Sequence, residues 1–262
     1  ITVLHDRLLG IIEYSEWLVP PSITRVCLLR SGPLCAELRK RYSGEGRQAD
    51  TLHGTTHLEM PGTTLMLSPG AKGRISRLSE AERARGVMAY SSGNHAQGVA
   101  RHAGAMGIRA TIVMPEGTPM VKVHQTRALG AEVDITGADF DAAKAHALSL
   151  ADETGAVFIH PFDDPVVMAG QGTLAAEMLD EHPDLDTLVL PVGGGGLAAG
   201  CGLAARRVKP DIELVGVQSD LFPSFANLYH GTDRPIGGFT LAEGIAVREP
   251  GRQTRSILAD LL

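Results

Sequence analysis

The feature that most constrains the fold is a regular alternation of short apolar segments with helical patterns from residue 86 onward. The expected strands are residues 87–90, 109–114, 132–136, 156–159, 187–192 and 212–217. The expected helices between them are residues 94–106, 119–129, 140–153, 166–180 and 196–208. Such alternation is typical of βαβ units, whose right-handed crossovers place helices on both faces of a parallel sheet. The sequence therefore predicts an α/β fold with parallel twisted sheets.

The chain before residue 86 is less regular. Residues 32–46, "GPLCAELRKRYSGEG", indicate a helix that ends in a glycine-rich turn. The segment "ISRLSEAERARG" indicates a second helix, in which Ser79 is the N-cap and Glu82 completes a capping box three residues later.

Composition and charge exclude several classes of function. The 262 residues include 44% hydrophobic and 21% charged residues, as expected for a globular chain. The net charge of −6 provides no basic surface for nucleic acid or an anionic membrane. The three cysteines form no CxxC pair, and the amino-terminal segment resembles neither a signal peptide nor a membrane span. We therefore expect a cytoplasmic protein with no nucleic-acid or membrane partner.

The first candidate site is the run "AYSSGNHAQGVARHAG", where an expected strand gives way to an expected helix. The N–H groups of the first helical turn lack partners within the helix, and the helix dipole favours negative charge there. A carboxylate or phosphate is therefore a natural ligand of this junction. The alternative is that Ser91, Ser92 and Asn94 only cap the helix.

The second candidate site is the run of four glycines, Gly193 to Gly196, between an expected strand and an expected helix. Without Cβ atoms, the backbone can wrap closely around an anion and bind it through N–H groups. The run has neither the GK[ST] of a Walker loop nor the GxGxxG of a dinucleotide site. A tight turn that allows close packing is the structural alternative. Ligands of open α/β sheets bind at the carboxyl ends of the strands, where both candidate sites are expected.

Four segments together resemble the fold-type II pyridoxal-phosphate enzymes, specifically the branch of threonine/serine dehydratases and serine racemases. They are "SSGNHAQGVA", "TIVMPEGTPMVKVHQTRALGAEV", "HPFDDPVVMAGQGTLAAEML" and "PVGGGGLAAG", in this order. The resemblance runs from about residue 75 to the end of the chain, with a weaker echo near Thr24. It implies a tryptophan synthase β-like architecture, in which a small domain of residues 68–158 is inserted in a large domain of residues 1–67 and 159–262.

The resemblance also implies roles for individual residues. Gly193, Gly194, Gly195, Gly196 and Leu197 would bind the phosphate of pyridoxal 5′-phosphate. Asn94 would hydrogen-bond the 3′-oxygen of the cofactor's pyridine ring. Ser91, Ser92, Gly93 and His95 would surround the substrate carboxylate through N–H and side-chain donors, and Ser92 would act as an acid/base as its serine racemase counterpart does.

The family's Schiff-base lysine is the point where this sequence departs from the pattern, which resembles S-F-K-x-R-G-A. An ungapped register that places Gly70 and Ala71 on the final GA puts Leu67 at the lysine position, and leucine can neither attach the cofactor nor carry a proton. Lys72 is the candidate among the five lysines, although its use requires a five-residue shift, about 7 Å along a helix.

Two further departures concern the carboxyl-terminal half. Gln218 replaces the acidic residue of metal-responsive members, so we expect no bound divalent cation there. Glu243 matches an acidic family position, where a structural role is an equal alternative. The family region that contacts the pyridine nitrogen, together with part of the large domain, is expected to be missing from this chain.

The resemblance predicts a pyridoxal-phosphate-dependent lyase, a threonine or serine ammonia-lyase that forms a 2-oxo acid and ammonia. A serine or amino-acid racemase is one alternative. A catalytically silent relative that binds phosphate or an amino acid without turnover is another. A generic nucleotide-binding domain is disfavoured because the fingerprint spacings are absent. The expected partners are a small amino-acid substrate and further copies of the chain, forming a homo-oligomer such as a dimer.

Overall fold

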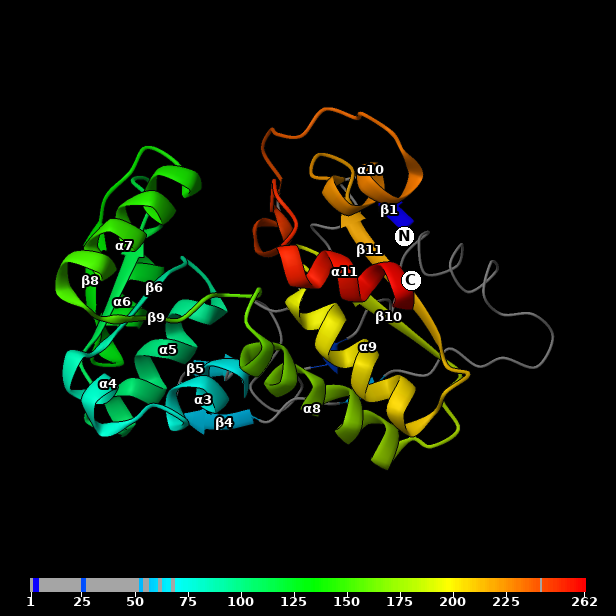
Figure 1. The fold of residues 1–262 in the computed structure, drawn as a ribbon, viewed down its shortest axis with the longest axis horizontal. Helices are drawn as coiled ribbons and strands as arrows, with labels where there is room; N and C mark the ends of the chain where they lie inside the picture. Colours follow the sequence, from blue (N-terminus) through cyan, green and yellow to red (C-terminus); the bar gives the residue numbers. More distant parts are fainter. Residues whose placement is uncertain are drawn as a thin grey trace. The chain divides into compact units, whose positions relative to one another are not determined.

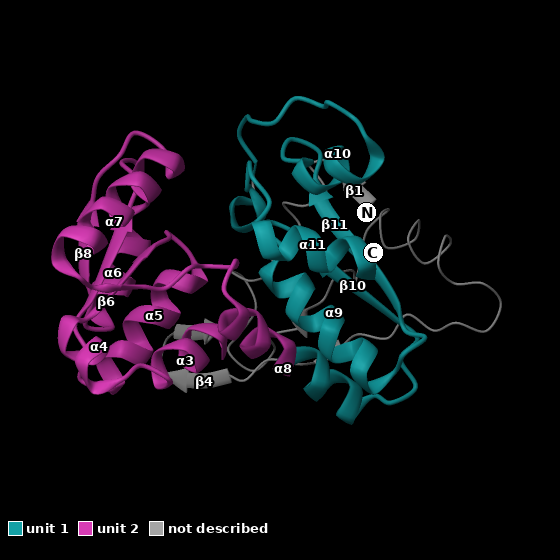
Figure 2. Cartoon of the chain, viewed as in Figure 1, with its two compact units in different colours: residues 1–64, 174–262 teal, residues 65–173 magenta. Residues whose placement is uncertain are grey.

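The computed structural model describes residues 2–4, 25–26, 52–53, 57–60, 63–66, 69–240 and 242–262. The chain divides into two compact units, one of residues 65–173 and one of residues 1–64 and 174–262 (Figure 2). The helix expected within residues 32–46 and the position of Leu67 lie outside the described residues. The predicted domain boundaries at residues 67/68 and 158/159 stay a prediction.

A parallel sheet forms the centre of the unit of residues 65–173. Its strands are β6 (Val87–Tyr90), β7 (Ala110–Met114), β8 (Glu132–Ile135) and β9 (Val157–Phe158), in the order β8-β7-β6-β9. All neighbouring pairs are parallel. All four residues of β6 are buried, as expected for a central strand with helices on both faces.

Helices cover both faces of this sheet (Figure 1). They are α3 (Pro69–Ser76), α4 (Glu80–Arg85), α5 (Asn94–Ala105), α6 (Met120–Ala128) and α7 (Phe140–Thr154). Buried residues of α3, α5 and α6 pack with Val87 and Ile112 in one cluster. Buried alanines of α7 pack with Met88 and Tyr90 in another cluster. Alternate side chains of the strands thus face opposite helical layers.

Local capping signals define several helix ends. Ser79 accepts a hydrogen bond from the Glu82 N–H at 3.3 Å, and the Glu82 carboxylate accepts one from the Ser79 N–H at 2.8 Å. This confirms the predicted capping box at the start of α4. Asp139 caps α7 by accepting a hydrogen bond from the Ala142 N–H at 2.9 Å. Gly155 ends α7 with a φ of 69°, in the left-handed region that glycine adopts readily.

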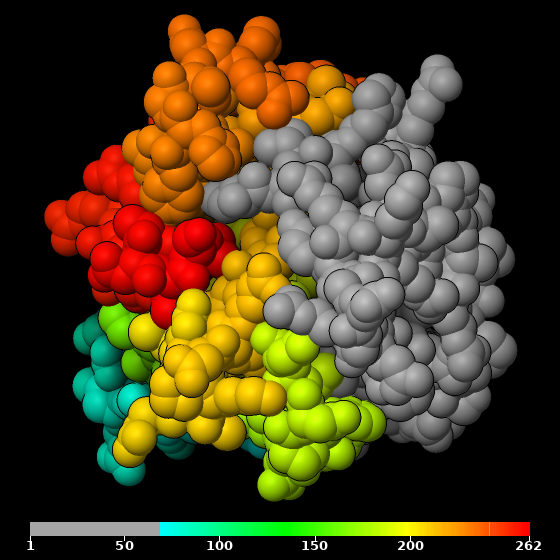
Figure 3. All heavy atoms as spheres, turned by 90° about the vertical axis from the view of Figure 1, so that its right-hand side faces the viewer, coloured from blue at the N-terminus to red at the C-terminus, as the bar shows by residue number. Residues whose placement is uncertain are grey.

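The second unit contains a three-stranded parallel sheet in the order β1-β11-β10. Its strands are β1 (Thr2–Leu4), β10 (Thr187–Pro191) and β11 (Glu213–Ser219). Its helices are α9 (Gly196–Val208), α10 (Ser224–His230), the 3₁₀ helix η1 (Glu243–Ile245) and α11 (Arg252–Leu261). Helix α11 packs along α9, as Figure 3 shows in red and yellow.

The remaining described elements connect or precede these layers. Helix α8 (Pro165–Glu181) begins in the unit of residues 65–173 and ends in the other unit. Strand β2 (Arg25–Val26) pairs antiparallel with β3 (Leu52–His53), and β4 (His57–Met60) pairs with β5 (Thr63–Met66).

The structure confirms the predicted α/β fold class. Each strand and helix expected from residue 87 onward is present, and the ends differ by two residues or fewer. Strand β11 continues to Ser219 because its last residues are fully buried and still paired with β1. In the part of the chain that the structure describes, no helix is both long and apolar enough to cross a membrane.

Candidate functional site

The Ser91–His95 loop lies at the carboxyl end of β6. Ser91 is buried, and its hydroxyl accepts a hydrogen bond from the Gly93 N–H at 3.1 Å. Gly93 is the N-cap of α5, and no side chain caps this helix. The alternative in which the polar side chains of the loop only cap the helix therefore receives no support. The N–H groups of the first turn are in the position that suits an anion.

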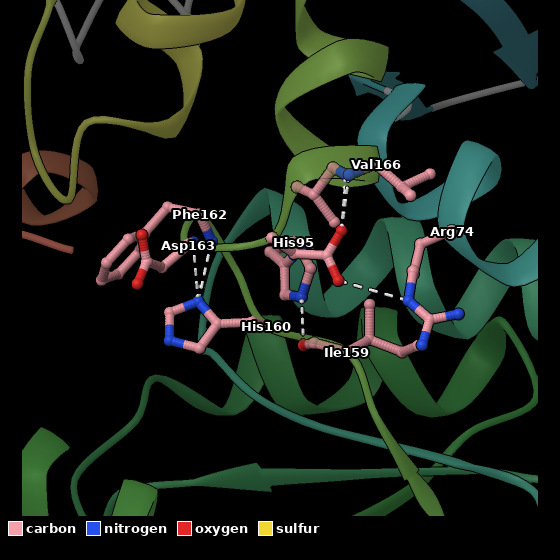
Figure 4. Close-up of polar contacts among 9 residues, drawn as sticks. Arg74, His95, Ile159, His160, Phe162, Asp163 and Val166 are labelled. Carbon is pink, nitrogen blue, oxygen red and sulfur yellow. Dashed lines mark hydrogen bonds and ion pairs between the residues drawn. The ribbon is translucent and has the colours of Figure 1, made fainter. Parts of the chain in front are cut away.

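His95 contributes a neutral ring to this loop. Its Nε2 lies 3.0 Å from the carbonyl oxygen of Ile159, which can only accept, so Nε2 carries the proton (Figure 4). Burial lowers the pKa of His95 to about 4, so the ring is uncharged at neutral pH. Its Nδ1 is buried and has no hydrogen-bond donor among the described residues. In this tautomer, His95 offers an acceptor lone pair and has no free donor for a carboxylate.

The start of α8 is fixed beside His95 by Asp164. One carboxylate oxygen of Asp164 accepts hydrogen bonds from the Val166 and Val167 N–H groups at 2.8 and 3.0 Å. The other oxygen lies 3.2 Å from Nε of Arg74, on α3 (Figure 4). Asp164 thereby caps α8 and ties it to α3 through an ion pair.

His160 organises the turn between β9 and α8. Its Nδ1 accepts hydrogen bonds from the Phe162 and Asp163 N–H groups at 3.2 and 2.8 Å (Figure 4). Burial is the main cause that lowers the pKa of His160, which favours the neutral ring that this acceptor role requires. The ring also makes an edge contact with Phe162, with centroids 4.7 Å apart. Hydrogen bonding and aromatic packing thus hold the turn in one conformation.

The sequence analysis assigned no role to Arg74, His160 or Asp164. A signal for Asp164 was present, because an aspartate directly before a proline is a typical N-cap and N1 pair at a helix start. The contacts of Arg74 and His95 carried no such signal, since each depends on a partner more than 60 positions away in the chain.

The glycine loop joins β10 to α9 in the other unit. Gly195 has a φ of +94°, and a Cβ there would lie 2.7 Å from Cζ of Phe225 and 2.8 Å from Cβ of Thr254. Both the backbone conformation and the packing therefore require glycine. Thr254 donates a hydrogen bond to the Gly194 carbonyl at 2.7 Å, which fixes the loop from the side of α11.

No side chain caps α9, whose N-cap is Gly195. All four glycines are buried, and Leu197 is half-buried. The loop thus combines a narrow backbone with the N–H groups of a helix start, which is the donor set that a phosphate group takes. The residues present therefore fit a phosphate group such as that of the cofactor implied by the resemblance.

Gln218 has a structural role in this unit. Its buried amide oxygen accepts hydrogen bonds from the Phe225 and Ala226 N–H groups at 3.0 Å each, so it caps α10 from strand β11. Its amide nitrogen donates to the Val192 carbonyl at 3.1 Å. A carboxylate could not make this last donation. Within the described ranges, no group of three or more histidine, cysteine or acidic side chains is assembled as a metal site.

Lys72 lies on α3, and its side chain is exposed. Burial is the main cause that lowers the pKa of His102, in the last turn of α5, and the charge of Lys72 is the next cause. The Ser91–His95 loop leads into the opposite end of the same helix. The structure brings Ser91, Ser92, Gly93, Asn94 and His95 together in one loop, whereas Lys72 lies on a different element, α3.

Comparisons with known proteins agree with this architecture. The family model described as "Pyridoxal-phosphate dependent enzyme" matches residues 69–262. The chain is 50% identical over 187 residues to an L-threonine ammonia-lyase of Thermotoga maritima, covering 71% of this chain and 47% of the relative. This chain thus spans about half the length of that enzyme.

Solved structures show the same fold. The processed form of threonine deaminase isoform 2 from Solanum lycopersicum matches with a TM-score of 0.70 and 37% identity, over 76% of this chain and 56% of that one. Maize serine racemase matches with a TM-score of 0.70 and 32% identity, over 75% of this chain and 60% of that one. The chain belongs to the family of pyridoxal-phosphate dependent enzymes, and its cofactor is pyridoxal 5′-phosphate.

Proposed function

We propose that the protein containing this chain is an ammonia-lyase that converts threonine or serine to a 2-oxo acid and ammonia. The observation that carries the proposal is the pair of uncapped helix starts, α5 and α9, each of which directly follows a parallel strand. Similarity to a threonine ammonia-lyase and a threonine deaminase supports the choice of substrate.

The residue roles in this proposal follow from the chemistry of each loop. Gly193, Gly194, Gly195, Gly196 and Leu197 hold the phosphate through backbone N–H groups. Asn94, at the first position of α5, hydrogen-bonds the 3′-oxygen attached to the pyridine ring of the cofactor. The N–H groups of the Ser91–Gly93 segment and its hydroxyls orient the substrate carboxylate. When bound, the cofactor supplies an electron sink for negative charge at the substrate α-carbon.

Proton movement in this proposal involves Ser92 and Lys72. Ser92 follows Ser91 in the anion-binding loop, so its hydroxyl is a candidate acid/base at the substrate. Lys72 remains the candidate for covalent attachment and for removal of the α-proton. Its exposed position on α3, near His102, does not by itself bring it to the loop.

Two alternative functions have specific support. The placement of Lys72, together with leucine at position 67, favours a relative that binds phosphate or an amino acid without turnover. The match to maize serine racemase favours a racemase. A dimer and a small domain of residues 68–158 are also proposals, supported by the family resemblance. A cytoplasmic location is a further proposal, supported by the absence of paired cysteine motifs from the sequence.

The experiment is a turnover assay of the full chain with added pyridoxal phosphate. We expect 2-oxobutyrate from L-threonine and pyruvate from L-serine. Gly194→Asp should abolish both, because a side chain carrying negative charge at the phosphate loop opposes the phosphate. D-serine without 2-oxo acid would instead identify a racemase, and saturable cofactor binding without any product would identify the silent relative.

A further inference from the structure

A cavity lies at the amino ends of the strands in the unit of residues 65–173. It has a volume of about 450 Å³ and is lined by residues of β6, β7, β8 and α7 and by Arg85 and Arg109 before the strands. The Ser91–His95 loop lies at the carboxyl end of β6, whose four residues span about 13 Å. The cavity is therefore separate from the candidate site described above.

The strand register explains what lines this cavity. Met88, Thr111 and Glu132 stand side by side across β6, β7 and β8. Met88 packs with buried residues of α7, so this row faces the α7 layer. Asp134 follows two positions after Glu132 on the same face, and its carboxylate contacts Nε2 of His146 on α7 at 2.8 Å.

Positive charge lies at one side of this cavity. Arg109 precedes Thr111 by two positions and so points to the same face of the sheet. Its guanidinium donates a hydrogen bond to the carbonyl oxygen of Arg85 at 3.1 Å, which holds the Arg109 side chain along the end of the sheet. The Arg85 side chain lines the cavity as well.

Negative and apolar groups complete the lining. Asp134 is held by His146 and by a hydrogen bond from Thr136 at 2.6 Å, and these contacts, led by the one from Thr136, lower its pKa and keep it ionised. The side chain of Glu132 is exposed and has no hydrogen bond or ion pair with any described residue. Leu150 of α7 adds an apolar surface.

We propose that this cavity binds a small apolar α-amino acid as its zwitterion. The arginine side takes the carboxylate, because a guanidinium fork matches a carboxylate with two hydrogen bonds. The Glu132 side takes the ammonium group, and Leu150 contacts the aliphatic side chain. A lone anion or a lone amine would satisfy one side of the cavity and leave the other charge unmatched. The volume is within the range of small-molecule sites.

The test is calorimetric titration of the full chain with L-valine, which lacks the β-hydroxyl that the proposed reaction removes. Isovalerate and isobutylamine are the matched probes, because each retains the aliphatic part but lacks the ammonium or the carboxylate. We expect saturable binding of L-valine only. Arg109→Gln and Glu132→Gln should each weaken it by roughly tenfold. Arg77→Gln and Glu80→Gln, at exposed positions outside the cavity, should leave it unchanged.

A Ser91→Ala variant separates this cavity from the proposed catalytic loop. Binding that is lost in Ser91→Ala and retained in Glu132→Gln would overturn the proposal, because valine would then occupy the anion-binding loop. Absence of saturable binding, or equal binding of isovalerate, would overturn it as well. Because the side chain of Glu132 is exposed, Glu132→Gln changes the charge at the cavity without changing the packing of the core. The outcome does not depend on turnover and leaves the proposed lyase reaction untouched.

Discussion

His95 shows how burial can decide what a single side chain contributes. The family resemblance implies a side chain beside the substrate carboxylate, and the structure gives this side chain a neutral ring whose one N–H is bound to Ile159. Charging this ring would require a proton on the buried Nδ1, which has no acceptor among the described residues. Burial removes the water that would stabilise the imidazolium, and this is the main cause of the low pKa of His95.

The low pKa of His95 predicts an acid-sensitive fold. The folded-state pKa is about 4 and the ordinary value is 6.5. Below pH 6.5 the unfolded chain takes up a proton that the native ring refuses, so stability falls from there until about pH 4. His95→Gln, whose amide can still donate to Ile159, should reduce the difference in urea midpoint between pH 7.5 and pH 4.5. His124→Gln, at an exposed position, is the control, and an equal reduction in both variants would contradict the assignment.

At the scale of elements, α3 and the first half of α8 approach so closely that their backbones meet. A Cβ built at Gly170 would lie 2.5 Å from Cα and 2.6 Å from N of Gly70. The Gly70 N–H also donates to the Gln171 side chain at 3.2 Å. The ion pair of Arg74 with Asp164 joins the same two helices. This contact explains why the first half of α8 belongs to the compact unit of residues 65–173.

Alanine substitutions at two glycines of this helix pair should have different effects on the free energy of unfolding. Gly170→Ala should destabilise the fold by about 1–3 kcal/mol, because the new methyl group meets backbone atoms that cannot move independently. Gly73→Ala, on α3, is the matched control. Its Cβ would have its nearest contacts at 3.7 Å, so it should be neutral or stabilising by about 0.5–1 kcal/mol through helix propensity. Chemical denaturation measures both, and a Gly170→Ala variant as stable as Gly73→Ala would show that the approach is looser than the structure indicates.

At the scale of the whole molecule, each compact unit has its own uncapped helix start, but neither loop contains a lysine. The proposed anion binding and the covalent attachment of the cofactor would therefore depend on different parts of the chain. The first would use backbone N–H groups of the described loops. The second rests on the position of one lysine relative to the ungapped family register.

Leu67→Lys is the variant that separates these two properties. If the ungapped register is right, an amine at position 67 meets the cofactor in an apolar pocket, where burial lowers its pKa and raises its reactive fraction. We expect a yellow protein with pyridoxal phosphate and, after borohydride reduction, a labelled peptide containing position 67. Lys72→Ala should keep phosphate binding nearly intact. A labelled Lys72 in the unmodified protein would contradict this register and support Lys72 as the covalent lysine.

The sequence by itself determined the order of the strands and helices from residue 87 to residue 219 and the place of the two loops that we propose to bind anions. These features depend on local patterns, namely hydrophobic periodicity, capping residues such as Ser79, and glycine at positions such as Gly195. Only the tertiary structure decided the proton position of His95, the capping of α10 by Gln218, and the joining of α3 to α8 by Arg74. It also placed Glu132 beside Thr111 in the cavity at the amino ends of β6, β7 and β8. Each of these depends on a contact between residues far apart in the chain, where burial and strand register, rather than local pattern, decide which groups meet.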